Sequence, residues 1–231
     1  MNDIFSGVIA ENRSILTEIE AKMIFTEAGI NCTDTRLARN KEEAVSLSKE
    51  IGYPVVLKVS SVDITHKSDA GGVKVNIKDK NAVETAYGDI LASVKDKYPD
   101  AVIEGVSVQG MAKPGIEIII GMTKDPQFGP VIMFGLGGIM VEVLKDVTFR
   151  TVPLDKNEAE NMIKGIKGYK ILQGNRGQEP ADIGYLADMI VKISEFIDKT
   201  PEIKELDMNP VFAYKDGAVV ADARIVLEKF A

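Results

Sequence analysis

Hydrophobic and polar residues alternate along the chain with two periods, one typical of strands and one typical of helices. Val55–Ser60 is an apolar run that contains one lysine, and Val73–Ile77 alternates apolar with polar residues, as a half-buried strand does. Asn40 and Asp79 precede segments whose apolar residues recur at helical spacing. Because several predicted strands follow one another without an intervening helix, we expect α+β lobes rather than a doubly wound parallel sheet.

The N-terminal region is predicted to be a loose arm over 1–16, followed by a helix over 17–28. Thr17 and Glu20 have the spacing of a capping box, in which each side chain accepts the backbone N–H of the other residue. The residues expected to form the buried stripe of this helix are Ile19, Met23 and Ile24. We expect the whole region, 1–29, to pack on the larger of two lobes.

The rest of the chain is long enough to form two lobes, each with its own core. The small lobe is predicted over 30–104 and carries Lys58 and His66. The large lobe is predicted over 105–231 and ends in a hairpin that carries candidate metal ligands.

Composition and charge narrow the classes of partner and location. The 231 residues carry a formal net charge of −7 and no basic cluster, which argues against nucleic acid as a ligand. The single cysteine, Cys32, excludes an intrachain disulfide and fits a reducing, cytoplasmic location. The longest apolar runs are far too short to span a membrane, so no membrane partner is expected.

The one histidine of the chain, His66, follows the strand that carries Lys58 and precedes the pair Gly71–Gly72. A lone imidazole excludes a multi-histidine metal site, but its neutral ring nitrogen can accept a phosphoryl group near pH 7. Lys58 would neutralise a nucleotide phosphate, and the glycines would let backbone N–H groups approach the ligand. The alternatives are a solvated or core-edge histidine and a lysine that reaches into solvent from an edge strand.

The last predicted hairpin carries three oxygen-bearing side chains. With a four-residue turn over Tyr214–Gly217, Asn209 faces Asp222 across the ladder, and Asp207 shares the face of Asn209. Hard oxygen ligands on one rigid surface suit Mg²⁺ that is held jointly with phosphates. The alternative is a solvated sheet face, although Asp and Asn are poor strand formers and need a reason to be there.

Four further residues are candidates for contacts with a nucleotide. Arg150 could reach a phosphate or a phosphohistidine, or it could form an exposed ion pair. Glu117 lies in an apolar strand and needs a polar partner, for which a ribose hydroxyl pair is one option. Gln109 ends its strand and could face adenine, and Met111 completes the predicted nucleotide-binding set.

These residues, together with four motifs, resemble the ATP-grasp subunit of NDP-forming acyl-CoA synthetases, and most of all the β subunit of the ADP-forming acetyl-CoA synthetases. The similarity covers nearly the whole chain. The terminal hairpin is also similar to that of succinyl-CoA synthetase β subunits, whose Asn and Asp metal ligands align with Asn209 and Asp222. The four motifs are Gly121–Pro130, Phe134–Gly138, Asp146–Arg150 and Glu205–Pro210.

The resemblance implies an ATP-grasp fold, in which two lobes clamp ATP or ADP, with Mg²⁺ on Asn209 and Asp222. It implies the reaction acyl-CoA + ADP + phosphate ⇌ acid + ATP + CoA, with His66 passing the phosphoryl group to Mg-ADP. The CoA-binding chemistry would lie on a partner α subunit, in an α2β2 heterotetramer, so this acid–thiol ligase would be active only with that partner.

The resemblance also implies two features of the relay. Asp207 would orient the ring of His66, a role that competes with metal binding by the same carboxylate. The loop around His66, residues 60–72, would have to move between two sites.

Two other functions remain compatible with the sequence. One is an ATP-grasp ligase that makes a free acyl phosphate and needs no phosphohistidine. The other is a non-catalytic nucleotide-binding module. The full set of His66, Asp207, Asn209 and Asp222 argues against the second.

Overall fold

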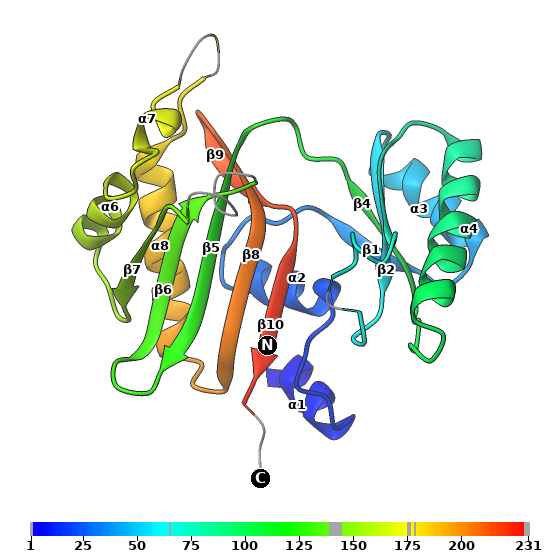
Figure 1. Ribbon diagram of the computed structural model, residues 1–231, viewed down its shortest axis with the longest axis horizontal. Helices are drawn as coiled ribbons and strands as arrows, with labels where there is room; N and C mark the ends of the chain where they lie inside the picture. The colour runs from blue at the N-terminus through cyan, green and yellow to red at the C-terminus, as the bar shows by residue number, and fades with distance from the viewer. Residues whose placement is uncertain (1, 65, 139–144, 175–176, 178, 229–231) are drawn as a thin grey trace. The chain divides into compact units, whose positions relative to one another are not determined.

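The computed structural model describes residues 2–64, 66–138, 145–174, 177 and 179–228. The chain divides into two compact units, each with its own antiparallel sheet and its own helices (Figure 1). All pairings between the described strands are antiparallel, as the α+β prediction requires. The smaller unit comprises 17–22 and 33–112, and the larger comprises 1–16, 23–32 and 113–231.

The smaller unit is a four-stranded sheet in the order β1-β4-β2-β3, with two helices packed on it. The side chain of Asn40 caps the first of these helices, and that of Asp79 caps the second, as their positions in the sequence predicted. The strands are β1 (Thr35–Ala38), β2 (Val55–Ser60), β3 (Val73–Ile77) and β4 (Gly105–Gly110), and the helices are α3 (Lys41–Ile51) and α4 (Lys80–Lys97).

Strand β2 is the central element of the smaller unit. It pairs with β4 on one side and with β3 on the other, and all six of its residues are buried. Strand β4 therefore belongs to this sheet, and the unit extends to residue 112, beyond the boundary at 104 that the sequence suggested. The reason is a long-range pairing of β4 with β1 and β2, which leaves no signal in local hydropathy.

The larger unit is a six-stranded sheet in the order β10-β8-β5-β6-β7, and β9 also pairs with β8. Helices α6 and α8 pack on each other, and α8 lies behind β6 and β7 in the view of Figure 1. The strands are β5 (Ile116–Asp125), β6 (Gly129–Leu136), β7 (Val147–Thr151), β8 (Ile203–Tyr214), β9 (Gly217–Val220) and β10 (Ala223–Leu227). The helices are α1 (Asn2–Ala10), α6 (Lys156–Lys164), α7 (Tyr169–Leu172) and α8 (Ile183–Asp198), and a further helix, α2 (Glu18–Glu27), is shared between the two units.

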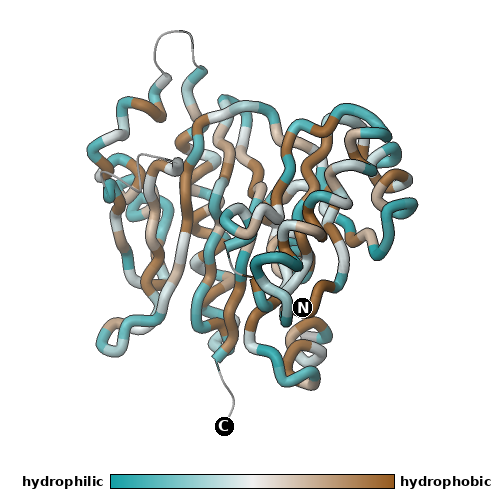
Figure 2. The backbone as a smooth tube through the Cα atoms, turned by 45° about the vertical axis from the view of Figure 1, so that its right-hand side comes forward, coloured by the Kyte–Doolittle hydropathy of each residue, from teal (hydrophilic) through white to brown (hydrophobic). Residues whose placement is uncertain are grey.

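The hydrophobic pattern agrees with this division into elements. In Figure 2 hydrophobic segments follow the strands, whereas hydrophilic segments mark most of the connecting turns. Within the part of the chain that the structure describes, none of the helices has the length and apolar character needed to cross a membrane.

The N-terminal region differs from the sequence prediction in two ways. Residues 2–10 form helix α1 rather than a loose arm, with Phe5 and Val8 buried. Helix α2 begins with the predicted capping box, because Thr17 and Glu20 bond each other's backbone N–H groups. Its buried face matches the predicted stripe only in part, since Ile24 is buried and Ile19 is half-buried, whereas Met23 is 52% exposed. The buried residues of α2 are Glu18, Ala21, Lys22, Ile24 and Phe25.

The two ends of α2 fall in different units. Thr17–Lys22 belongs to the smaller unit, whereas 23–32 belongs to the larger one. The region was expected to pack on the larger lobe as a whole, and only part of it does so.

Two glycines, one on α4 and one on β4, allow a test of how the helices and strands of the smaller unit pack. Gly88 is exposed in the middle of α4 and has open space where a Cβ would stand, so Gly88→Ala should stabilise the protein by about 1 kcal/mol through helix propensity. A Cβ atom at Gly105 would overlap the carbonyl group of Ala38 on the neighbouring strand. We expect Gly105→Ala to destabilise the protein by about 1–3 kcal/mol, as overpacking does.

Thermal and urea denaturation of both variants measure the two effects. Equal stability of Gly105→Ala and the parent protein would contradict the close approach of β1 and β4.

Candidate functional site

Lys58 lies in the middle of β2 and is only 6% exposed. Its ammonium group donates a hydrogen bond to Oε1 of Glu18 over 2.8 Å, and its backbone carbonyl accepts one from the hydroxyl of Ser107 on β4. A lysine in this position is held by its strand and by its ion pair. It is therefore not the solvated lysine of an edge strand that the sequence left open.

The carboxylate of Glu18 binds three ammonium groups. Oε1 accepts from Lys22 at 2.7 Å as well as from Lys58, and Oε2 accepts from Lys67 at 2.6 Å. The carboxylate and the ammonium groups of Lys22 and Lys58 are almost fully buried, and that of Lys67 is mostly so. Burial weakens screening by water, so these contacts are stronger than surface ion pairs.

Lys22 connects this carboxylate to the edge of the sheet. Its ammonium group also donates to the hydroxyls of Thr33 and Thr35 and to the amide oxygen of Gln109, each over 2.9 Å. Gln109 is buried, and its oxygen is thus already bonded inside the smaller unit. Met111 is 40% exposed, and its backbone N–H bonds the carbonyl of Pro54. Contacts of either residue with adenine remain a prediction.

His66 is exposed and begins a compact turn between β2 and β3. Its carbonyl accepts the N–H of Ala70, and the carbonyl of Lys67 accepts the N–H of Gly72 over 2.8 Å. Gly71 has φ +71°, a conformation that favours glycine, and a Cβ at Gly72 would collide with the side chain of Val59 on β2. The glycine pair is therefore required for the turn to pack against the strand that carries Lys58.

In the larger unit, one antiparallel register runs along β8 and brings the hairpin residues together. Ala213 pairs with Ala218 in β9, and Met208 pairs with Ala223 in β10. Between these ladders the N–H of Asn209 donates to the carbonyl of Asp222 over 3.2 Å. The sequence therefore predicted the pairing of this hairpin correctly.

A β-bulge falls at the same place on β8. Ile118 of β5 pairs with Val211 and Ile120 pairs with Met208, so three steps along β8 oppose two steps along β5. The extra residue lies at Asn209–Pro210, where the proline has no N–H to donate to a ladder. Bulges of this kind are common beside functional sites, because they change the direction of a side chain.

Asp207 lies two residues before Asn209, opposite Gly121 of β5 and Arg224 of β10. Burial raises the pKa of Asp207, and the negative charge of Asp222 raises this pKa further, whereas Arg224 lowers it. The two carboxylates are thus close enough to repel each other.

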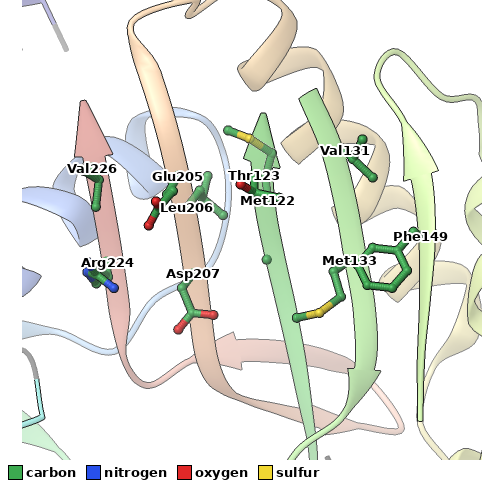
Figure 3. A pocket seen from close by; sticks show the side chains of 11 residues that line it. Met122, Thr123, Val131, Met133, Phe149, Glu205, Leu206, Asp207, Arg224 and Val226 are labelled. Atoms are coloured by element: carbon green, nitrogen blue, oxygen red, sulfur yellow. The ribbon is translucent and has the colours of Figure 1, made fainter. Parts of the chain in front are cut away.

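Asp207 also lines a groove on the face of the larger sheet, with a volume of about 340 Å³. In Figure 3 its side chain lies between Arg224 of β10 and Met133 of β6, with Phe149 of β7 beyond Met133. Gly121 forms the floor beside it, where a Cβ would approach Met133 and Asp207. The groove combines two acidic groups, Asp207 and Glu205, with one basic group, Arg224, and walls that are mostly apolar.

The remaining candidates, Glu117 and Arg150, lie on two other strands of the larger unit. Glu117 is exposed on β5, and its backbone carbonyl accepts the N–H of Gly137 over 2.7 Å. Arg150 is half-buried on β7 opposite Ile132, and its guanidinium donates to the carbonyl of Phe149. Their proposed contacts with ribose and phosphate remain predictions.

The hairpin side chains fit a magnesium ion that also binds phosphate. Asp222 and Asn209 supply oxygen atoms at one point of a rigid ladder, and a cation there would relieve the repulsion between Asp222 and Asp207. Within the described ranges, no three side chains of His, Cys, Asp or Glu are grouped as a metal site. An ion with few protein ligands is the arrangement in which Mg²⁺ keeps water and phosphate oxygens.

Sequence reasoning missed the charged cluster around Glu18. A signal was present, because Glu18 and Lys22 are four residues apart and lie on the same face of α2 as Ala21 and Phe25. An i, i+4 pair of this kind usually indicates a solvated surface, and here it is buried.

The model of the ATP-grasp domain family matches residues 7–227. The chain belongs to the ATP-grasp family. It is 52% identical over 225 residues to the β subunit of ADP-forming acetate–CoA ligase I of Pyrococcus furiosus, and the alignment covers 97% of each chain.

Two solved structures of dinucleotide-forming acetyl-coenzyme A synthetase 1 from Ca. Korarchaeum cryptofilum have the same ATP-grasp fold. One holds coenzyme A, acetyl-coenzyme A and a phosphorylated phosphohistidine segment, with a TM-score of 0.90 and 46% identity. The other holds coenzyme A and Mg-AMPPCP, with the phosphohistidine segment pointing towards the nucleotide binding site, a TM-score of 0.86 and 45% identity. Each match covers 98% of this chain and 99% of the other. The ATP-grasp fold predicted from the motifs is confirmed.

The raised pKa of Asp207 predicts a pH-dependent stability in metal-free protein. Because the pKa of the folded state lies above the ordinary value of 3.8, protonation of Asp207 favours folding. That contribution is complete below pH 3.8 and is lost as the pH rises through the folded-state pKa. We expect Asp207→Asn to raise the melting temperature at pH 7, with the gain vanishing near pH 4.

Thermal melts between pH 4 and 8 in the presence of a chelator measure this effect. The control is Asp216→Asn, which changes an exposed carboxylate in the turn between β8 and β9. A stability gain for Asp207→Asn that does not vary with pH would contradict the electrostatic explanation.

Proposed function

We propose that this chain is the nucleotide-binding β subunit of an ADP-forming acyl-CoA ligase. It would catalyse the step in which a phosphoryl group passes between His66 and Mg-ADP. The observation that carries the proposal is an exposed histidine on a glycine turn that packs against the strand of a buried lysine, Lys58. The similarity to a β subunit over 97% of each chain supports it.

In this function the smaller unit supplies the phosphoryl carrier and a cation. A neutral ring nitrogen of His66 attacks the γ-phosphorus of ATP, the bond to the ADP oxygen breaks, and the ring loses a proton as the phosphoramidate forms. The reverse step makes ATP. Lys58, and glycine N–H groups at Gly71 and Gly72, would neutralise phosphate charge, because phosphoryl transfer depends mainly on positioning and charge.

In the larger unit Asn209 and Asp222 would hold Mg²⁺, which neutralises charge on the phosphates. Asp207 would orient the imidazole of His66 and stabilise its phosphorylated form, and Arg150 would contact the phosphoryl group. Gln109, Met111 and Glu117 would contact the adenosine part. The raised pKa of Asp207 supports a carboxylate that benefits from a cationic or N–H partner.

The complete reaction requires a second subunit in this proposal. The relative from Pyrococcus furiosus is named a β subunit, and a CoA-binding α subunit would complete the enzyme. We infer an α2β2 assembly, in which the partner forms an acyl phosphate from acyl-CoA and phosphate, releasing CoA, and the phosphoryl group then passes to His66 as the acid is released. In the opposite direction His66 returns the phosphoryl group to the partner, which activates the acid.

The first test is phosphorylation of His66. On incubation with ATP and Mg²⁺, with the α subunit present where required, His66 should gain one phosphoryl group. Mass spectrometry of peptides kept at neutral or alkaline pH detects this group, because phosphohistidine is acid-labile. His66→Ala should lose both the label and acyl-CoA synthesis.

A complete and active assembly without modification of His66 would contradict the relay. Activity that persists in His66→Ala would instead indicate a ligase that makes a free acyl phosphate.

The second test concerns the metal site of the hairpin. We expect Asp222→Ala to weaken Mg-ADP binding by at least about tenfold, since even the outer partners of metal ligands contribute that much affinity. Isothermal titration of Mg-ADP measures this loss, with Asp216→Ala in the adjacent turn as the matched control. Equal affinity of Asp222→Ala and the parent protein would exclude Asp222 as a metal ligand.

A further inference from the structure

Glu18 has a buried carboxylate that takes no part in the proposed phosphoryl transfer. Its Oε1 binds Lys22 and Lys58, and its Oε2 binds Lys67 over 2.6 Å. Lys67 directly follows His66 in the chain, whereas Lys58 lies on β2. One carboxylate thus joins the strand of the proposed phosphate-binding lysine to the segment that carries the histidine.

Glu18 is held in place before Lys67 binds it. The capping box of Thr17 and Glu20 fixes the first turn of α2, where a carboxylate is also favoured by the helix dipole. One turn later, Lys22 is anchored to Thr33, Thr35 and Gln109. The carboxylate is therefore a preorganised acceptor, and it binds Lys67 of the turn between β2 and β3.

The His66 segment, defined as residues 66–72, is folded by its own backbone. The N–H groups of Ala70, Gly71 and Gly72 bond carbonyls inside the segment, and these bonds do not involve Glu18. The far end of the segment is attached to the smaller unit, because the N–H of Val59 bonds the carbonyl of Gly72 over 2.7 Å and Ala70 is buried. The side chain of His66 is exposed, so burial of the ring does not fix the position of the other end. A charge-assisted bond from Lys67 to a buried carboxylate can do so.

We propose that Glu18 is a positioning residue that docks the His66 segment on the smaller unit through its ion pair with Lys67. Docking brings the segment to the same carboxylate as Lys58. Loss of the pair loosens the segment, including the hydrogen bonds of its turn, of which that from Gly72 ends on the carbonyl of Lys67 itself. The docking itself needs no phosphoryl transfer, and only its consequence for turnover rests on the proposed function.

The direct test is hydrogen exchange of the segment amides, measured by NMR or mass spectrometry. We expect Lys67→Met to speed the exchange of Ala70, Gly71 and Gly72 by about tenfold, which corresponds to about 1.4 kcal/mol of lost docking free energy. The matched control is Lys74→Met on β3, a lysine whose side chain is 41% exposed and whose ammonium lies 3.7 Å from Asp89. This control should leave the exchange unchanged.

Glu18→Gln provides the second arm. It should speed the same amides, and the double variant with Lys67→Met should exchange no faster than the faster single variant, because both remove one interaction. If Glu18→Gln does not fold, Lys67→Met alone decides the question. Unchanged exchange in Lys67→Met, or additive effects in the double variant, would overturn the proposal.

Kinetic measurements distinguish a positioning role of the Glu18–Lys67 pair from a merely structural role. Lys67→Met should lower the rate of His66 phosphorylation at least about tenfold while the Kd for Mg-ADP stays within about twofold of the parent value. A weaker Mg-ADP affinity that accounts for the whole loss would overturn the positioning role.

The failure of docking and the failure of the relay give different results. The hydrogen-exchange measurement needs neither nucleotide nor the α subunit. Faster exchange in Lys67→Met together with an unmodified His66 in the active parent assembly would support docking and reject the relay. A phosphorylated His66 together with unchanged exchange would support the relay and reject docking.

Discussion

A carboxylate removed from water must be surrounded by donors or cations, and Glu18 in the smaller unit meets this requirement with three ammonium groups. This requirement determines much of the local geometry. It holds the first turn of α2 against the sheet, fixes the ammonium of Lys58 inside it, and draws in Lys67 from the turn that follows. In the smaller unit, Lys58 and the segment that carries His66 are thus arranged around one charge.

In the larger unit, by contrast, the main electrostatic interaction of the proposed site is a repulsion between like charges. Asp207 and Asp222 repel each other, and Arg224 offsets the raised pKa of Asp207 only in part. The backbone pairing of β8 with β9 and β10 prevents the two carboxylates from separating. A rigid pair of carboxylates gains from a divalent cation, which would be the physical basis for the metal role that we propose for this hairpin.

Features coded by nearby residues could be predicted from the sequence. Asn40, Asp79 and Thr17 cap helices through partners three residues away, and the turn before Gly217 determines the register of the last hairpin. Lys58 and His66 were recognised because their neighbours are unusual for purely structural segments.

Features that depend on distant partners could not be predicted in the same way. Glu18 and Lys22 have the spacing of a surface ion pair, and only Lys58, Lys67 and Gln109, which are 40 to 87 residues away from them, make that helix face a buried one. For the same reason the sequence placed Met23 on the buried face of α2, although its side chain is exposed. The pairing of β4 with β1 and β2 is also long-range, so the boundary near residue 104 was misplaced.

The docking of His66 and its phosphorylation are linked through Lys67. A phosphoryl group on His66 would add nearly two negative charges beside Lys67, and it would compete with Glu18 for the same ammonium group. If docking changes the equilibrium for phosphorylation by some factor, phosphorylation must change the equilibrium for docking by the same factor. One oxygen of the Glu18 carboxylate binds Lys58 and the other binds Lys67. This single group can therefore couple the phosphorylation of His66 to the position of its segment. Each cycle of the proposed relay would then release the segment at the step where it has to leave.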